Sequence, residues 1–137
     1  MGEPRAFVSF DFDHDETSRR LFVGQAKEGS PTPFVVQDWS SKYVLPQSQW
    51  EKIIEEKINR CHLVIVLVGR HMGSATGVVK EIQFAKNGNV PFFGVYVDGA
   101  GTNSTLPMGL ARNRVIGWTW PGIAKAIDQM MGEGKNK

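Results

Sequence analysis

Carboxylates are the side chains of this sequence best suited to chemistry. Glu81 lies in the early turns of a predicted helix, after a loop of Gly, Ser, Ala and Thr that follows a predicted buried strand. Small residues let a ligand approach the backbone closely, and the start of a helix favours an anion. A second group, Asp11, Asp13 and Asp15, lies directly after the first predicted strand. The sequence therefore indicates a ligand site, with Glu81 as its candidate reactive group.

The helical spacing around Glu81 leaves two interpretations open. Val78, Val79, Ile82 and Ala85 form one apolar stripe, and Glu81 falls on the flank of this stripe. On the flank, its carboxylate could reach the mouth of a pocket at the edge of a sheet. It could equally be a solvated side chain that the helix N-terminus favours. Spacing by itself does not decide between these interpretations.

The acidic group after the first strand also has alternatives. Clustered acids hold magnesium in receiver domains, but a receiver also needs an Asp after its third strand and a Lys after its fourth. At those places the sequence reads LVIVLVGR and FFGVYVDG, without that Asp and without that Lys, which excludes a receiver. Asp13 and Asp15 could cap the next helix, whereas Asp11, nearest to the strand end, is better placed for a pocket.

Other chemical motifs are missing from the sequence. It contains neither a P-loop nor a dinucleotide-binding fingerprint. His14, His62, His71 and the single Cys61 do not have the spacing of metal ligands, so we expect no metal site. Cys61 ends an amphipathic helical pattern, which favours a buried core thiol over a nucleophile.

Length and composition predict one globular domain. At 137 residues, 41% of them hydrophobic, the chain can bury a core as a single domain over 1–137, with about 133–137 as a frayed tail. A net charge of +2 is too small to indicate a nucleic-acid partner. No apolar run is long enough for a membrane span, and no signal-peptide pattern is present. With one cysteine, a reducing environment is favoured, so we expect a cytoplasmic protein without membrane partners.

Strand and helix patterns alternate along the chain. The strands are expected at 5–10, 34–38, 63–69, 91–97 and 114–118, with helical patterns between and after them. Such alternation predicts an α/β fold: a three-layer, flavodoxin-like, five-stranded parallel sheet in the order 2-1-3-4-5, with helices on both faces.

The parallel sheet would gather the candidate residues at one edge. Ligands of such folds bind outside the carboxyl ends of the strands. Three segments are expected to converge there, at 9–16, 38–47 and 70–81. The acidic group and Glu81 belong to two of these segments, which supports a shared site.

Three stretches together resemble one known family. RAFVSFDFDHD is similar to the first strand of TIR-like proteins, FVVQDWS to their second strand and its continuation, and LVIVLVGRHMGSATGVVKEIQFA to the small-residue loop and acidic helix. The similarity covers essentially the whole chain. Among TIR-like proteins, the pattern most resembles the ThsB components of the bacterial Thoeris anti-phage system.

This resemblance implies an enzyme that consumes NAD+ as its substrate and needs no cofactor. Enzymatic TIR domains cleave the nicotinamide–ribose bond with a glutamate at the place of Glu81. ThsB-like relatives make a cyclic ADP-ribose isomer or a related conjugate, a second messenger that activates a separate effector in antiviral defence. Self-association is also implied, because TIR enzymes often act as assemblies and need a trigger.

The remaining site residues follow from the same resemblance. Phe10 or Trp39 could stack on a flat ring, while Asp11 could bond a ribose or an amide. Many TIR glycohydrolases carry Trp four residues before the glutamate, where this chain has Gly77, so the space beside the carboxylate is larger. The substrate-binding residues expected by position are Ser9, Phe10, Asp11, Asp38, Trp39, Ser40 and Gly77.

Two other functions are compatible with the same residues. A non-catalytic TIR adaptor would signal by homotypic association, through surfaces such as the 39–47 loop, and Glu81 would be dispensable. A nucleotide-binding sensor would take up a ligand without turning it over. Replacing Glu81 distinguishes the enzyme from both.

Overall fold

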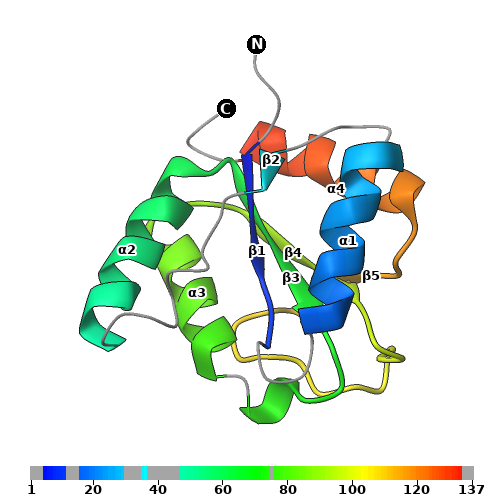
Figure 1. Ribbon diagram of the computed structural model, residues 1–137, viewed down its shortest axis with the longest axis horizontal. Coiled ribbons are helices and arrows are strands. Elements are labelled where there is room, and N and C mark those ends of the chain that lie inside the picture. The colour runs from blue at the N-terminus through cyan, green and yellow to red at the C-terminus, as the bar shows by residue number, and fades with distance from the viewer. Residues whose placement is uncertain (1–4, 12–15, 30–34, 37–46, 75, 134–137) are drawn as a thin grey trace.

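The protein, seen in a computed structural model, alternates strands and helices along the chain (Figure 1). The structure describes residues 5–11, 16–29, 35–36, 47–74 and 76–133. The strands are β1 (Arg5–Ser9), β2 (Val35–Val36), β3 (Leu63–Val68), β4 (Phe92–Tyr96) and β5 (Val115–Ile116). The helices are α1 (Glu16–Gly29), α2 (Gln47–Arg60), α3 (Thr76–Asn87) and α4 (Trp120–Glu133), with 3-10 turns at Met72–Ser74 and Arg112–Arg114.

All strand pairs in the sheet are parallel, and the order is β2-β1-β3-β4-β5. The predicted α/β fold, with a parallel sheet and helices, is therefore confirmed. Every residue of β3 is buried, as expected for a central strand covered on both faces. Strand β5 is shorter than the predicted 114–118, because Arg114 belongs to the preceding 3-10 turn.

Helices cover both faces of the sheet. Helices α2 and α3 pack against each other, and an ion pair between Lys80 and Glu51 joins them. Helices α1 and α4 form the other pair, in which the Phe22 ring lies 5.1 Å from the Trp120 ring and Trp120 Nε1 donates to Gln25 Oε1 at 2.9 Å. Figure 1 shows the two pairs on opposite sides of the strands.

The junction between α2 and β3 is closed by β1. The Arg5 guanidinium donates to the Arg60 carbonyl at 2.8 and 3.0 Å, which satisfies a carbonyl at the helix end, and the Arg5 backbone N–H donates to His62 Nδ1 at 2.8 Å. Burial and the Arg5 charge lower the pKa of His62. Cys61 beside it is fully buried, and burial raises its pKa to about 12. Its interpretation as a core thiol is confirmed.

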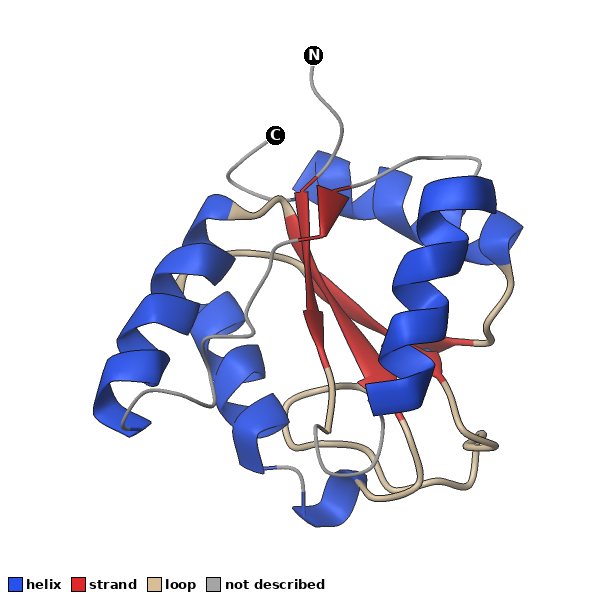
Figure 2. Cartoon of the chain, viewed as in Figure 1, coloured by secondary structure: helices blue, strands red, loops and turns tan. Residues whose placement is uncertain are grey.

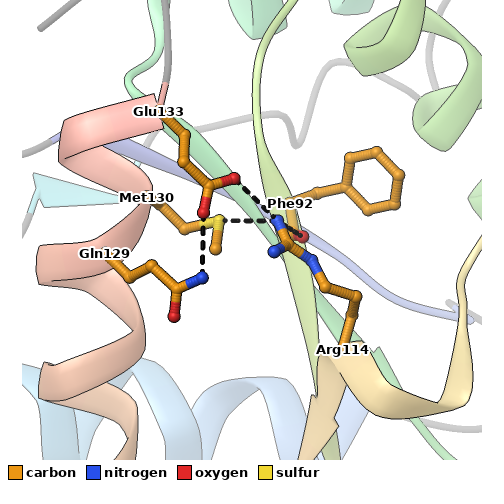
Figure 3. A network of polar contacts seen from close by, with 5 residues as sticks. All are labelled: Phe92, Arg114, Gln129, Met130 and Glu133. Carbon is orange, nitrogen blue, oxygen red and sulfur yellow. Dashed lines mark hydrogen bonds and ion pairs between the residues drawn. The ribbon is translucent and has the colours of Figure 1, made fainter.

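The edge strand β5 is tied to the end of α4 by Arg114 (Figure 3). Its guanidinium lies 3.1 Å from Glu133 Oε1, 3.4 Å from the Phe92 carbonyl oxygen and 3.3 Å from the Met130 sulfur. Gln129 donates to the other Glu133 oxygen at 2.9 Å. The sequence placed Glu133 in a frayed tail. In the structure it is the last residue of α4, and its carboxylate is bound by Arg114 and Gln129.

No helix among the described residues has the length and apolar character needed to cross a membrane.

Candidate functional site

The carboxyl ends of the strands meet at one edge of the sheet, because all neighbouring strands are parallel. The described residues that follow β1, β3 and β4 gather there, at the lower edge of Figure 2. Ser9 ends β1 at this edge, and α3 begins near it after the turn that follows β3. The edge is therefore the place where the candidate residues can meet.

Glu81 lies deeper than its predicted place on the flank of α3. The described residues of α3 that are buried are Val78, Glu81, Ile82 and Ala85, so the carboxylate belongs to the stripe that faces the sheet. Val79, assigned to the stripe from the sequence, is only half-buried. The exposed fraction of Glu81 is 0%, which rules out the solvated interpretation for this conformation and also the position at an open pocket mouth.

Ser9 makes a hydrogen bond to this buried carboxylate. Its hydroxyl donates a hydrogen bond to Glu81 Oε1 at 2.7 Å, and both residues are 0% exposed. A carboxylate in the interior requires hydrogen bonds or charge pairing, because its desolvation is otherwise too unfavourable. The bond joins residues 72 positions apart, so the sheet and α3 must both be formed before it exists.

Phe10 and Asp11 follow Ser9 and are also largely covered. Phe10 is 1% exposed and belongs to the hydrophobic core, whereas Asp11 is 7% exposed. Phe10 would have to leave its core contacts to stack on a ligand ring. Asp11 lies two residues after the end of β1 and is the more exposed of the two.

Of the other predicted site residues, the structure describes only Gly77. Gly77 lies in the first turn of α3 and is partly buried. Asp38, Trp39 and Ser40 lie outside the described residues, as do Asp13 and Asp15. The structure therefore brings Ser9 and Glu81 into contact, while Gly77 lies in the first turn of the helix that carries Glu81.

The loop after β4 also reaches this edge, although the sequence analysis did not include it. Asp98, with a φ of 53°, begins the loop, and its carboxylate lies 3.5 Å from the Arg70 guanidinium after β3. The predicted strand order could have indicated this loop, because β3 and β4 are neighbours and the loops that follow them therefore lie close together. Arg70 and Asp98 are exposed, so they are charged groups that a ligand at this edge could meet.

The same loop then packs back over α3. A Cβ on Gly109, whose φ is 96°, would lie 3.0 Å from Ile82 Cγ2, one residue along from Glu81. At Gly73, a Cβ would lie 3.9 Å from Thr105 Cγ2, in ordinary contact. Hydrogen bonds from the Arg112 guanidinium to the carbonyls of Thr102 and Ser104 stabilise the loop. Segment 98–111 thus packs against α3.

Two hollows among the described residues lie elsewhere. One of about 280 Å³ lies at the start of β4, beside Lys86 and Glu133. The other, of about 250 Å³, lies beside Phe93 and Arg114. Neither is lined by Ser9 or Glu81. Because the Glu81 side chain is 0% exposed, a ligand can reach its carboxylate only after the side chains that cover it move, as in active sites that close around a ligand.

Comparisons with known proteins agree with this fold. Residues 7–102 match the model of the family described as Thoeris protein ThsB, TIR-like domain. The crystal structure of a prokaryotic SEFIR domain has a TM-score of 0.53 and 18% identity, covering 95% of this chain and 91% of that chain. At this identity the likeness shows the fold alone.

A second structure resembles the chain less closely. It is a Trypanosoma brucei CTPS, glutaminase domain with bound acivicin, at 16% identity and a TM-score of 0.43. That similarity spans 69% of this chain and 36% of that chain, and it is too low to support an inference. No curated protein sequence matches the chain.

Proposed function

Because the chain belongs to the TIR-like domain family of the Thoeris protein ThsB, we propose that it is an NAD+-cleaving enzyme of anti-phage defence. It breaks the nicotinamide–ribose bond and turns the ADP-ribose part into a cyclic or related second messenger, which activates a separate effector. The observation that carries this proposal is the buried Glu81 carboxylate, held by Ser9 at the ligand-binding edge of the sheet.

The chemistry suits a carboxylate in a dry site. When the bond between the nicotinamide nitrogen and the anomeric carbon breaks, the electron pair leaves with nicotinamide, which becomes neutral, and positive charge develops on the ribose. A carboxylate beside the ribose stabilises that charge, more strongly where water is excluded. Attack by a second nucleophile on the anomeric carbon then gives the cyclic or conjugated product, and attack by water gives ADP-ribose.

Because Glu81 is buried, the protein must change conformation before NAD+ can react. Because the carboxylate is 0% exposed, NAD+ must displace covering side chains before the ribose reaches Glu81. Asp11 and Phe10 are near the strand end and are the described site residues that would move. This requirement agrees with an enzyme that acts only when assembled or triggered.

Glu81→Gln tests the proposal most directly. The amide keeps an oxygen that can accept from Ser9 Oγ, while the negative charge is lost. We expect a fall of about 100-fold or more in NAD+ consumption, the order found when one charge-stabilising group is removed. The measurement is mass spectrometry of small molecules from phage-infected cells that express the wild type or the variant. Unchanged NAD+ consumption and product would exclude the enzyme.

Glu56→Gln is the matched control. It makes the same chemical change at an exposed position of α2. Its NAD+ consumption should equal that of the wild type, with both variants present at the same level in the cells.

A non-catalytic adaptor is the second candidate, and the burial of Glu81 is the observation that favours it. A satisfied Ser–Glu hydrogen bond in the interior can serve folding alone. An adaptor would keep signalling in Glu81→Gln and would fail after surface changes in the 39–47 loop. A sensor without turnover would be stabilised against heat by NAD+ and would release no product.

A further inference from the structure

Ser9 touches the candidate catalytic group without being open to a ligand. Its hydroxyl lies 2.7 Å from Glu81 Oε1, and its exposed fraction is 0%. The hydroxyl has one proton to donate, and that proton points to Glu81. Direct contact with a substrate, which the family resemblance implied for Ser9, would require this covered hydroxyl to become accessible.

The backbone that carries Ser9 is rigidly placed. Strand β1 lies between β2 and β3, and Ser9 is paired in register with Val66 of β3. Glu81, in contrast, reaches its carboxylate through several rotatable bonds from a helix. A hydroxyl on a paired strand can therefore hold the carboxylate in one orientation, as a donor on a rigid element holds a reactive group.

The bond has a charged acceptor when Glu81 is ionised. Its 2.7 Å is an ordinary length for an O–H···O bond, and a bond of this kind to an ionised carboxylate is about twice as strong as one between neutral groups. Where the bond is buried, water cannot replace it. Its loss would leave the carboxylate with more orientations and a less favourable charged form.

We propose that Ser9 is a positioning residue, whose hydroxyl holds the Glu81 carboxylate in the orientation that stabilises the ribose cation. This inference rests on the proposed NAD+-cleaving function. Ser9 acts through Glu81 and forms no bond to the substrate. Its contribution therefore belongs to the chemical step and not to the binding of NAD+.

Steady-state kinetics of Ser9→Ala, Ser9→Thr and Glu81→Gln test the inference. The purified full chain is used at a concentration at which the wild type turns over NAD+. We expect Ser9→Ala to lower kcat by about 10- to 100-fold, the range for one hydrogen bond to a charged group, with KM within about 3-fold of the wild type. Ser9→Thr keeps a hydroxyl and should recover most of kcat.

Val8→Ala serves as the control for a loss of packing. Val8 is also buried in β1, and its side chain points to the opposite face of the sheet from that of Ser9. Its replacement by Ala therefore lowers stability without removing a contact to Glu81. Thermal unfolding of all variants shows which of them are folded at the assay temperature. If Ser9→Thr does not fold, the kcat-against-KM result of Ser9→Ala decides alone.

The outcomes separate this inference from the proposed function. Full activity of Glu81→Gln overturns the proposed function and the role of Ser9 with it. An inactive Glu81→Gln together with a normal kcat for Ser9→Ala overturns only the positioning role. So does a Ser9→Ala that raises KM instead, since Ser9 would then bind substrate, or that loses no more kcat than Val8→Ala.

Discussion

Gly94 occupies a crowded position on β4, where three side chains converge. A Cβ added there would lie 3.0 Å from Leu110 Cδ2 and 3.1 Å from methyl groups of Val115 and Val68. These distances are shorter than ordinary carbon–carbon contacts, and the neighbours come from the loop after β4, from β5 and from β3. The hydrogen side chain of Gly94 therefore allows the 98–111 loop to pack close to the sheet.

Gly94→Ala is expected to destabilise the protein by about 1–3 kcal/mol, the usual effect of overpacking a core. Urea unfolding, followed by circular dichroism, measures the change. Gly101→Ala is the control, because nothing lies within 4 Å of a Cβ there, and its effect should stay within about 0.5 kcal/mol. Equal midpoints for the two variants would contradict the crowding of Gly94.

A buried Glu on α3 is a costly residue choice for a fold. The position faces the sheet between Val78 and Ile82, where an apolar side chain would pack without needing a partner. Perturbed or buried carboxylates are more frequent at functional sites, although structural pairs also occur. Glu81→Leu would separate the two roles, since an apolar side chain can preserve or raise stability while it removes any catalysis.

At the scale of elements, the Arg114–Glu133 contact fastens the sheet edge to α4. The hydrogen bond from Arg114, followed by that from Gln129, lowers the pKa of Glu133 from its ordinary value of 4.5. A lowered folded-state pKa means that the ionised form is favoured by folding. Its stabilisation is present above pH 4.5 and is lost as the pH falls through the folded-state pKa.

Glu133→Gln should therefore lower stability at neutral pH, and its difference from the wild type should shrink below pH 4.5. The expected loss is less than about 1 kcal/mol, because both side chains are 32–40% exposed and solvent screens the pair. Urea midpoints of both proteins across pH 3 to 7 measure it. A difference that stays constant through this range would mean that the charge of Glu133 does not contribute.

At the scale of the whole molecule, we propose that self-association opens or completes the site. The Glu81 carboxylate is buried in the single domain, and the family resemblance implies that several chains associate. If association opens or completes the site, NAD+ turnover per chain should rise with protein concentration by mass action. A domain that is active alone would give a constant rate per chain.

Mixing experiments make this prediction sharper. The Glu81→Gln chain offers the same surfaces without the catalytic charge, so adding it to a dilute wild type should raise turnover per wild-type chain. The same amount of an unrelated protein should have no effect. A constant rate in both mixtures would contradict activation by self-association.

The sequence by itself determined the α/β pattern, the parallel sheet and the burial of Cys61. These features follow from local periodicity. The continuous apolar run of β3 specifies a strand covered on both faces, and the amphipathic pattern of α2 places Ile58 in the core and, directly after the helix, Cys61. The resemblance to TIR-like proteins gave both partners of the buried pair as site candidates, Ser9 and Glu81, but not their contact.

Only the tertiary structure decided how deep Glu81 lies and which group holds it. A helical wheel gives the direction of a side chain around its own axis, but the distance to the sheet depends on how α2, α3 and the 98–111 loop pack together. The Ser9–Glu81 bond joins positions 72 residues apart and has no local signal. Its formation depends on β1 and α3 arriving at the same edge of the sheet, which is a property of the folded chain.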